Sequence, residues 1–311
     1  MIKPKALKKG DTIGLIAPSG AVKAKDTALE AINILEAQGF KVKAEDSCFE
    51  RYGYLSGSDE LRAADLNKMF KDEEVKGVFC LRGGYGTPRI LDRIDYEMIK
   101  KNPKVFIGYS DITAIHIALN RFCKLVTFHG PMAASDMVGG FDEFSKASYL
   151  KAIMESEPLG ELTNPESFEI KTLVGGKASG QIVGGNLSLI AGTLGTPYEI
   201  NTKGKILFIE DISEYTYSVD RMLTELRLSG KLEECSGIII GDFKECEPQY
   251  ENFDHTLIQV FEDIIKPLGK PTIYNFRAGH CTPKITIPLG AEAEIDGDNC
   301  KVTVLESALE E

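Results

Sequence analysis

The fold of this chain is decided at residues 104–112, Lys104-Val105-Phe106-Ile107-Gly108-Tyr109-Ser110-Asp111-Ile112. The first four residues are mainly apolar and predict a buried strand. The apolar residues that follow recur at helical spacing, and they are Ile112, Ile115, Leu119 and Phe122. Ser110 therefore stands at a sharp strand-to-helix turn, where a hydroxyl projects above the edge of the sheet.

Strands and helices alternate on both sides of this stretch. Further strands are predicted at Asp11–Ala17, Phe40–Val42, Gly77–Leu81 and Leu125–Phe128, and helices at Thr27–Gln38, at Asp59–Phe70 and from Thr87. Gly39 is a suitable C-terminal cap for the first of these helices. This alternation predicts an α/β fold, a doubly wound and mainly parallel sheet with helices on both faces.

The stretch from 141 to 168 is polar and irregular, and it predicts a linker between two domains. The α/β domain then covers 1–140, and a smaller, β-rich domain covers 169–311. In the second domain strands are predicted at Ser179–Val183, Lys205–Ile209, Gly237–Ile240, Lys284–Pro288, Ala291–Ile295 and Cys300–Val304. Intervening helices are predicted at Asn186–Thr193, Ser218–Leu228 and Thr256–Ile265.

The composition limits the partners and the compartment. The 311 residues carry a formal net charge of −11, which repels phosphate backbones and argues against a nucleic-acid partner. The chain contains no apolar run near the ~20 residues of a membrane span and no signal-peptide pattern. The seven cysteines are odd in number and lack a CxxC pair, so we expect no disulfide framework and no zinc site. A reducing cytoplasm is the predicted location.

Two turns on the predicted sheet could contribute to an active site. The N–H of Asp111, at a helix N-terminus beside Ser110, could stabilise an oxyanion, but Ser110 could equally be a plain helix cap. The sequence 108–112 is not the GxSxG of α/β-hydrolases, because Ile112 replaces the second glycine. At the end of the strand Gly77–Leu81, the glycine-rich stretch 82–86 could form the other half of an oxyanion hole, a phosphate loop or merely a tight turn.

An acid and a histidine in the second half complete the candidate set. Glu210 ends an apolar strand, where a carboxylate could orient an imidazole or simply face solvent. His280 lies in a loop before a strand, a common place for a catalytic base, and His129 at a strand end is the rival base. The remaining candidates are His116 as a packing residue, His255 as an exposed residue and Cys281 as an alternative nucleophile.

Several short blocks of sequence resemble the LD-carboxypeptidases, also called muramoyltetrapeptide carboxypeptidases, a family that includes the microcin C immunity peptidases. The blocks follow the family's order from about Lys3 to Val304. They are Ile16-Ala17-Pro18-Ser19-Gly20, Arg82-Gly83-Gly84-Tyr85-Gly86, Gly108-Tyr109-Ser110-Asp111, Phe128-His129-Gly130-Pro131, Gly184-Gly185-Asn186-Leu187, Glu210-Asp211, Tyr217-Ser218-Val219-Asp220-Arg221 and Gly279-His280.

The resemblance implies a serine peptidase whose triad is Ser110, Glu210 and His280. The serine comes from the first domain and the other two residues from the second, with no metal and no cofactor. We expect the N–H groups of Gly84 and Asp111 to form the oxyanion hole. Arg82 and Tyr85 are the expected substrate contacts, although Arg82 could instead brace its loop through a carboxylate partner.

The resemblance also implies a substrate and an assembly. The family substrate is the cytoplasmic murein tetrapeptide, cut between the L-centre of a diamino acid and terminal D-alanine, and the family favours a homodimer. One alternative is an amidase that acts on microcin C-type aminoacyl nucleotides, for which the lack of tryptophan counts against a nucleobase shelf. The other is a non-catalytic nucleotide-binding module. The glycine turn lacks both the GxxxxGK[ST] lysine and the GxGxxG spacing that such a module requires.

Overall fold

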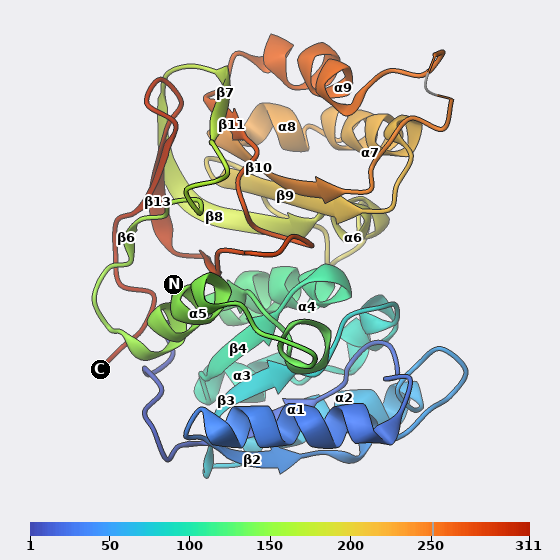
Figure 1. The fold of residues 1–311 in the computed structure, drawn as a ribbon, viewed down its shortest axis with the longest axis vertical. Coiled ribbons are helices and arrows are strands. Elements are labelled where there is room, and N and C mark those ends of the chain that lie inside the picture. Colours follow the sequence, from blue (N-terminus) through green and yellow to red (C-terminus); the bar gives the residue numbers. More distant parts are fainter. Residues whose placement is uncertain (251) are drawn as a thin grey trace. The chain divides into compact units, whose positions relative to one another are not determined.

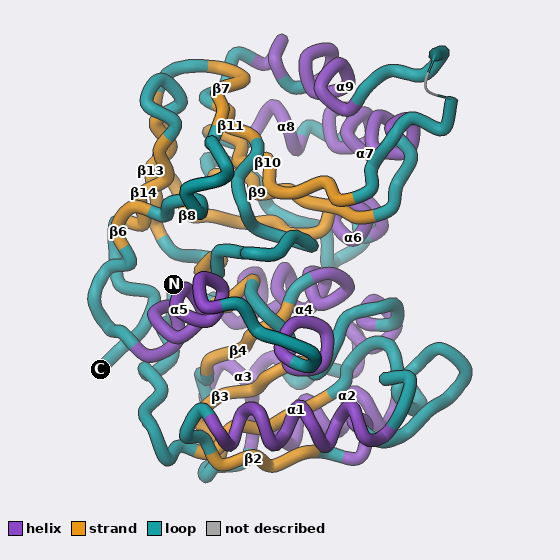
Figure 2. The backbone as a smooth tube through the Cα atoms, in the orientation of Figure 1, coloured by secondary structure: helices purple, strands orange, loops and turns teal. Residues whose placement is uncertain are grey.

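Two separate β-sheets organise the chain in the computed structural model, which describes residues 1–250 and 252–311. Each sheet belongs to its own compact unit. Unit 1 consists of Met1–Glu157, Thr286–Gly290 and Ser307–Glu311, and unit 2 of Pro158–Ile285 and Ala291–Glu306. Figure 2 shows that both units combine helices with strands.

The sheet of unit 1 has the order β12-β5-β4-β3-β1-β2. Its strands are β1 (Thr12–Ile16), β2 (Lys41–Ala44), β3 (Val75–Cys80), β4 (Val105–Gly108), β5 (Thr127–His129) and β12 (Ile287–Leu289). The first five strands are parallel, and only β12 runs antiparallel to its neighbour. The doubly wound, mainly parallel sheet is therefore confirmed.

The helices of unit 1 cover both faces of this sheet (Figure 1). They are α1 (Lys25–Ala37), α2 (Asp59–Lys71), α3 (Tyr96–Lys101), α4 (Thr113–Ala118) and α5 (Glu143–Met154). The chain goes outward from β1 to β2 and then crosses back over β1 to β3, so right-handed crossovers place α1 and α2 on opposite faces. The connection that leaves β1 leads to one side, towards β2, and the connection that leaves β3 leads to the other side, towards β4. The crossover direction therefore reverses between β1 and β3. The carboxyl ends of two such strands form the crevice where sheets of this type bind ligands.

Unit 2 contains an eight-stranded mixed sheet of order β6-β14-β13-β8-β9-β10-β11-β7. The strands are β6 (Gly160–Glu161), β7 (Lys171–Val174), β8 (Lys177–Asn186), β9 (Ile206–Ile212), β10 (Gly237–Lys244), β11 (Thr272–Tyr274), β13 (Glu292–Asp296) and β14 (Lys301–Val304). The helices are α6 (Leu187–Gly192), α7 (Thr216–Leu228), α8 (Lys231–Glu234) and α9 (Leu257–Ile264). The parallel strands β8 to β11 follow one another in order, so their right-handed crossovers place these helices on one face.

Among the differences from the sequence-based expectation, two concern the division of the chain into domains. Part of the predicted 141–168 linker forms α5, which is capped by Asp142 through a 2.9 Å hydrogen bond from the N–H of Ser145. Its buried face includes Tyr149, Ala152 and Ile153, residues at helical spacing that a search for aliphatic runs misses. The strand predicted at Lys284–Pro288 is instead β12, and it pairs with β5 in unit 1 and not within the second domain. All three of its residues are buried, and the strand covers the edge of β5 and is itself the last strand on that side of the first sheet.

Among the described residues, no helix has both the length and the apolar character that crossing a membrane would require.

Candidate functional site

Ser110 lies where β4 turns into a helix, as the sequence predicts. β4 is fully buried, Tyr109 is extended, and Ser110 opens a 3₁₀ turn over Ser110–Ile112 that continues into α4. The backbone of Ser110 has φ +66°, a left-handed conformation that costs a non-glycine residue of order 1–3 kcal/mol. Such strain persists only where neighbouring structure enforces it, so this serine is held in a fixed position at the sheet edge.

The glycine-rich loop after β3 packs directly against this serine. A Cβ atom at Gly83 would lie 2.9 Å from the Cβ of Ser110 and 3.0 Å from its Oγ, so the loop backbone fills the space beside the hydroxyl. The carbonyl oxygen of Gly83 accepts a 3.1 Å hydrogen bond from the N–H of Gly20, which joins the loops after β1 and β3. These are the two strands at which the crossover direction reverses. The loop after β3 borders Ser110, and the loop after β1 contacts the loop after β3.

The side chain of Asp111 points into unit 1 and is 1% exposed. One carboxylate oxygen accepts hydrogen bonds from the hydroxyl of Ser19 at 2.6 Å and the N–H of Thr87 at 2.8 Å. Burial raises the pKa of Asp111, and the hydrogen bonds from these two partners oppose the rise. Sequence reasoning assigned a role only to the backbone N–H of this residue and did not foresee the contacts of its carboxylate.

Arg82 and Tyr85 occupy the same loop. Arg82 is half-buried, and its Nη1 donates a 2.6 Å hydrogen bond to the carbonyl oxygen of Ala21. This arginine therefore braces its loop, although through a carbonyl and not through a carboxylate partner. Tyr85 is 51% exposed, and its ring lies 5.8 Å from that of Tyr54, which is 66% exposed. The two rings form an aromatic surface on loops of unit 1.

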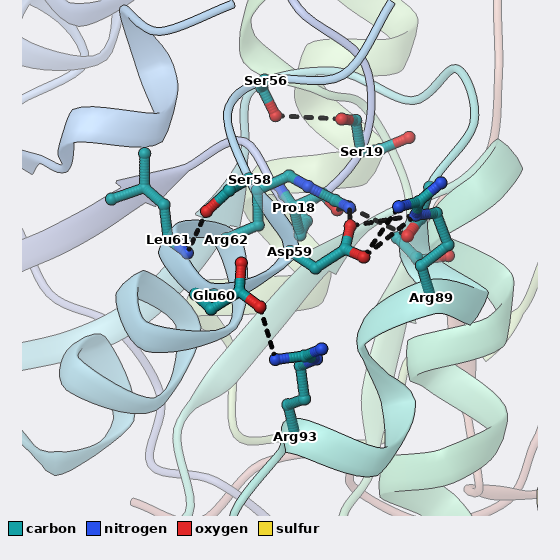
Figure 3. Close-up of polar contacts among 12 residues, drawn as sticks. Pro18, Ser19, Ser56, Ser58, Asp59, Glu60, Leu61, Arg62, Arg89 and Arg93 are labelled. Atoms are coloured by element: carbon teal, nitrogen blue, oxygen red, sulfur yellow. Dashed lines mark hydrogen bonds and ion pairs between the residues drawn. The ribbon is translucent and has the colours of Figure 1, made fainter. Parts of the chain in front are cut away.

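Arg62 is a residue that the sequence analysis missed. Its side chain is fully buried in α2, where Nη1 donates to the carbonyl oxygens of Pro18 and Gly86. Its other end pairs with Asp59, which Arg89 also contacts at 2.9 Å (Figure 3). An arginine in an otherwise ordinary amphipathic helix gives no local signal of such a role.

In unit 2, Glu210 and His280 form a close pair. The Nδ1 of His280 lies 2.6 Å from Oε2 of Glu210, whose side chain is fully buried, while the imidazole is 12% exposed. A carboxylate can only accept, so Nδ1 carries the proton and Nε2 is left as the basic nitrogen of the neutral ring. β9 continues two residues beyond Glu210, so the acid projects from within the strand and not from its end.

Two glycines make room for this pair. Gly279 has φ +114°, and a Cβ atom there would lie 2.6 Å from Oε2 of Glu210. A Cβ atom at Gly241 would lie 2.6 Å from the carbonyl oxygen of Ala278 and 3.2 Å from the Cβ of Glu210. The loop before His280 can therefore lie directly over the buried carboxylate only because both positions lack side chains.

The residue after Glu210, Asp211, makes further buried polar contacts. Asp211 accepts hydrogen bonds from the Asn186 amide and from both the N–H and the hydroxyl of Ser188, at 2.8–2.9 Å. Burial, and then the neighbouring charge of Glu210, raise the pKa of Asp211. The sequence blocks 184–187 and 210–211 contain the two ends of this network, but nothing local in them shows that Asn186 contacts Asp211.

The other sequence candidates differ from the acid–histidine pair in their burial and contacts. His116 donates from Nε2 to the carbonyl oxygen of Gly108 at 2.9 Å, and burial lowers its pKa to about 3, so it packs as a neutral ring. His129 is 1% exposed, with its ring 5.7 Å from that of Tyr109. His255 is exposed. Burial raises the pKa of Cys281 to about 12, which suppresses the thiolate that a cysteine nucleophile requires.

Comparison with known proteins matches both units to one family. The model of the LD-carboxypeptidase N-terminal domain matches residues 13–130, and that of the LD-carboxypeptidase C-terminal domain matches residues 179–295. A probable murein peptide carboxypeptidase of Bacillus subtilis (strain 168) is 47% identical over 315 residues, covering 99% of this chain and 96% of that protein.

Solved structures share the fold over nearly the whole chain. The muramoyltetrapeptide carboxypeptidase of Oxalobacter formigenes has a TM-score of 0.84 at 29% identity, covering 94% of this chain and 97% of that one. The structure of MccF in complex with glutamyl sulfamoyl guanosine has a TM-score of 0.91 at 26% identity, with full coverage of both chains.

Proposed function

Because this chain belongs to the LD-carboxypeptidase family and is a serine-type carboxypeptidase, we propose that it releases terminal D-alanine from murein tetrapeptides. Ser110 is the proposed nucleophile, His280 the base and Glu210 the acid that orients the base. The observation that carries the proposal is the 2.6 Å contact between the His280 Nδ1 and the fully buried Glu210 carboxylate. A buried acid on one imidazole nitrogen leaves the other as a proton acceptor, as nucleophilic catalysis requires.

The proposed reaction has two steps that share one base. In the first, Nε2 of His280 takes the Ser110 proton while Oγ attacks the carbonyl carbon of the diamino acid. The N–H groups of Gly84 and Asp111 would stabilise the oxyanion, and His280 would then protonate the amine of departing D-alanine. In the second, water attacks the acyl-enzyme with the same base, which restores Ser110 and releases the shortened peptide.

Arg82 and Tyr85 are the proposed substrate contacts. A guanidinium carries five N–H donors, so Arg82 can hold the carbonyl oxygen of Ala21 and still bind the terminal carboxylate of the peptide. Tyr85, together with Tyr54, offers an exposed aromatic surface for the rest of the ligand. Substitution of Arg82 by glutamine should raise KM for the tetrapeptide far more than it lowers kcat, which steady-state kinetics would show.

The stereochemistry of the cleaved bond tests the reaction class. Tetrapeptides ending in D-alanine and in L-alanine are incubated with the protein, and the products are identified by mass spectrometry. We expect release of D-alanine only, because inversion at the α-carbon moves either the carboxylate or the methyl group out of its pocket. Equal cleavage of both peptides would contradict the proposed specificity. Retention of most activity in folded Ser110→Ala would contradict the serine mechanism, for which a loss on the order of 10⁴-fold is expected.

Location and assembly are part of the same proposal. We place the reaction in the cytoplasm, where murein peptides are recycled, and propose a homodimer. Sedimentation equilibrium of the purified protein tests the assembly, and a monomer at micromolar concentration would contradict it. Membership of a peptidase family removes the alternative of a non-catalytic nucleotide-binding module.

The second candidate function is an amidase that acts on aminoacyl nucleotides. It is favoured by the relative whose structure holds glutamyl sulfamoyl guanosine and by the exposed pair Tyr54 and Tyr85, since aromatic side chains stack on nucleobases. The two functions are distinguished by measuring kcat/KM for a tetrapeptide and for an aminoacyl sulfamoyl nucleoside and comparing the two values. A value for the nucleoside that exceeds the peptide value and falls in Tyr85→Ala would favour the amidase.

A further inference from the structure

A buried carboxylate, that of Asp111, directly follows the proposed nucleophile in the chain and accepts hydrogen bonds from two other segments. Asp111 directs one oxygen, Oδ2, at the hydroxyl of Ser19 and at the N–H of Thr87, at 2.6 and 2.8 Å. The hydroxyl of Thr87 donates in return to the backbone carbonyl of Asp111. Ser19 belongs to the loop after β1, and Thr87 follows the glycine-rich loop after β3. One side chain therefore ties both loops to the turn that carries Ser110.

A buried arginine holds the same two loops from the other direction. Nη1 of Arg62 bridges the carbonyl oxygens of Pro18 and Gly86, the residues directly before Ser19 and Thr87. Its Nη2 pairs with Asp59, which is itself fixed by Arg89 (Figure 3). In each loop, the residue bonded to Arg62 directly precedes the residue bonded to Asp111. The two side chains that hold the loops carry opposite charges.

The two loops held in this way also contain the glycines that pack together beside Ser110. Gly83 has no room for a Cβ atom beside the serine hydroxyl, and its carbonyl oxygen is bonded to the N–H of Gly20. Gly84 also packs closely against Gly20, since a Cβ atom at Gly84 would lie 3.2 Å from the Cα of Gly20. The loop cannot shift away from Ser110 without breaking charge-assisted hydrogen bonds, which are stronger than neutral ones.

Stability of the fold alone does not explain why Arg62 and Asp111 are buried beside these loops. Burying an arginine and an aspartate carries a desolvation cost that well-packed apolar side chains avoid, so buried charged groups are weak evidence for a stabilising role. The ionic groups do supply directional bonds that fix backbone positions. Preorganised N–H groups stabilise a developing charge because they need no reorientation during the reaction.

We propose that Asp111 is a positioning residue for the reaction of Ser110: through Ser19 and Thr87, its carboxylate holds the Arg82–Gly86 loop in the geometry that stabilises the oxyanion. Arg62 secures the same loop from α2. This inference rests on the proposed function, because it assumes that Ser110 is the nucleophile. The carboxylate of Asp111, unlike its backbone N–H, acts through other residues, so its removal changes the stabilisation of the transition state and leaves substrate binding intact.

The test is Asp111→Asn, which keeps the shape of the side chain and removes its charge. We expect kcat to fall about 10- to 100-fold while KM changes less than about threefold, because the affected interaction forms only in the transition state. A tripeptide analogue that ends at the diamino acid, with an aldehyde in place of the carbonyl that is cleaved, should lose affinity by the same factor as kcat, since Ser110 converts the aldehyde into a hemiacetal whose oxygen occupies the oxyanion position. Ser19→Ala removes one of the two hydrogen bonds and should have a smaller effect in the same direction.

Asp65→Asn is the matched control. Asp65 is also a buried carboxylate of unit 1, 5% exposed, and accepts a 2.8 Å hydrogen bond from the N–H of Ser47. This variant should lower the melting temperature as Asp111→Asn does, but leave kcat within about threefold of the wild-type value. A loss of stability alone therefore cannot account for the expected result.

The outcomes separate this inference from the proposed function. If Ser110→Ala is inactive but Asp111→Asn and Ser19→Ala lower kcat no more than Asp65→Asn, the positioning role is wrong and the serine mechanism stands. A rise in KM at unchanged kcat would also overturn the positioning role. If Asp111→Asn fails to fold, Ser19→Ala and the aldehyde decide the matter alone. If Ser110→Ala retains activity, the proposed function itself fails.

Discussion

Replacing Gly83 with alanine would add one methyl group directly beside the proposed nucleophile. The φ of Gly83 lies outside the left-handed region, so alanine meets no backbone strain there. The new Cβ would lie 2.9 Å from the Cβ of Ser110 and 3.0 Å from its Oγ, with the methyl of Met132 at 3.4 Å. The perturbation therefore acts mainly on the serine side chain.

The size of the effect follows from these distances. Non-bonded carbon atoms prefer a separation of about 3.5–4.0 Å, so Ser110 and the loop must move apart by roughly 0.6–1.1 Å. Overpacking of this kind typically lowers the free energy of unfolding by about 1–3 kcal/mol. A displacement near 1 Å at a reacting atom costs up to about 10²-fold in rate, so we expect kcat to fall about 10- to 100-fold.

Two measurements on the same protein check this prediction. Steady-state cleavage of a tetrapeptide ending in D-alanine gives kcat, and the rate of labelling by a fluorophosphonate reports on Ser110 without any peptide. Gly192→Ala is the control, because Gly192 ends α6 with open space around it. This change should stabilise the protein by about 0.5–1 kcal/mol and leave both rates unaltered.

One result would refute the reasoning. If Gly83→Ala is folded and both its kcat and its labelling rate stay within about twofold of the wild-type values, the loop does not restrain Ser110. Loss of kcat with a normal labelling rate would instead place the damage in the oxyanion or substrate contacts of the loop.

Four further predictions concern the acid–histidine pair, the backbone around it, a buried lysine and the independence from metal. Glu210→Gln should lower kcat by about 10³- to 10⁴-fold, and His280→Ala combined with Ser110→Ala should lower it little further than either change alone, because triad members act as a unit. Gly279→Ala would force a Cβ atom into a backbone with φ +114° and place it 2.6 Å from Oε2 of Glu210. Thermal denaturation should show that the free energy of unfolding falls by about 2–4 kcal/mol, and steady-state kinetics should show a near-complete loss of activity. Burial lowers the pKa of Lys104 from 10.5 to about 8, so the unfolded chain binds more protons between these values. The free energy of unfolding should therefore rise between about pH 7.5 and about pH 9.5, as measured by urea titration at both values. This rise should be about 1–2 kcal/mol larger in the wild type than in Lys104→Met. Equal rises in the two proteins would contradict the assigned pKa. Chelators should leave the tetrapeptide cleavage rate unchanged, and inhibition by EDTA that added metal reverses would contradict the serine mechanism.

Local sequence patterns predicted most of the first sheet. The apolar runs of β1, β3 and β4 and the helical spacing in α1 and α2 are properties of single segments, so they can be recognised before any tertiary contact is known. The sharp turn at Ser110 was visible for the same reason, because it lies between a buried strand and an amphipathic helix. The resemblance to the LD-carboxypeptidases then singled out Glu210 and His280, which local patterns alone left among several alternatives.

Short or less aliphatic elements could not be assigned from such patterns. β12 has three residues, and only its pairing with β5, about 160 positions earlier, makes it a strand of unit 1. α5 buries Tyr149 and Ala152 together with one aliphatic residue, so its buried face is weakly marked. In both cases the tertiary contact, and not the local preference, decides the structure.

By itself the sequence therefore determined the fold class, the turn that presents Ser110 and the candidate acid and histidine. Only the tertiary structure decided how these groups are held. The pairing of Glu210 with His280 joins residues 70 positions apart, and the hydrogen bond from Ser19 to Asp111 joins residues 92 apart. Arg62, on a helix between two strands, bridges carbonyls on either side of it in the chain. Contacts between distant segments depend on which loops the strand order of the sheet brings together, and a local sequence pattern does not predict that order.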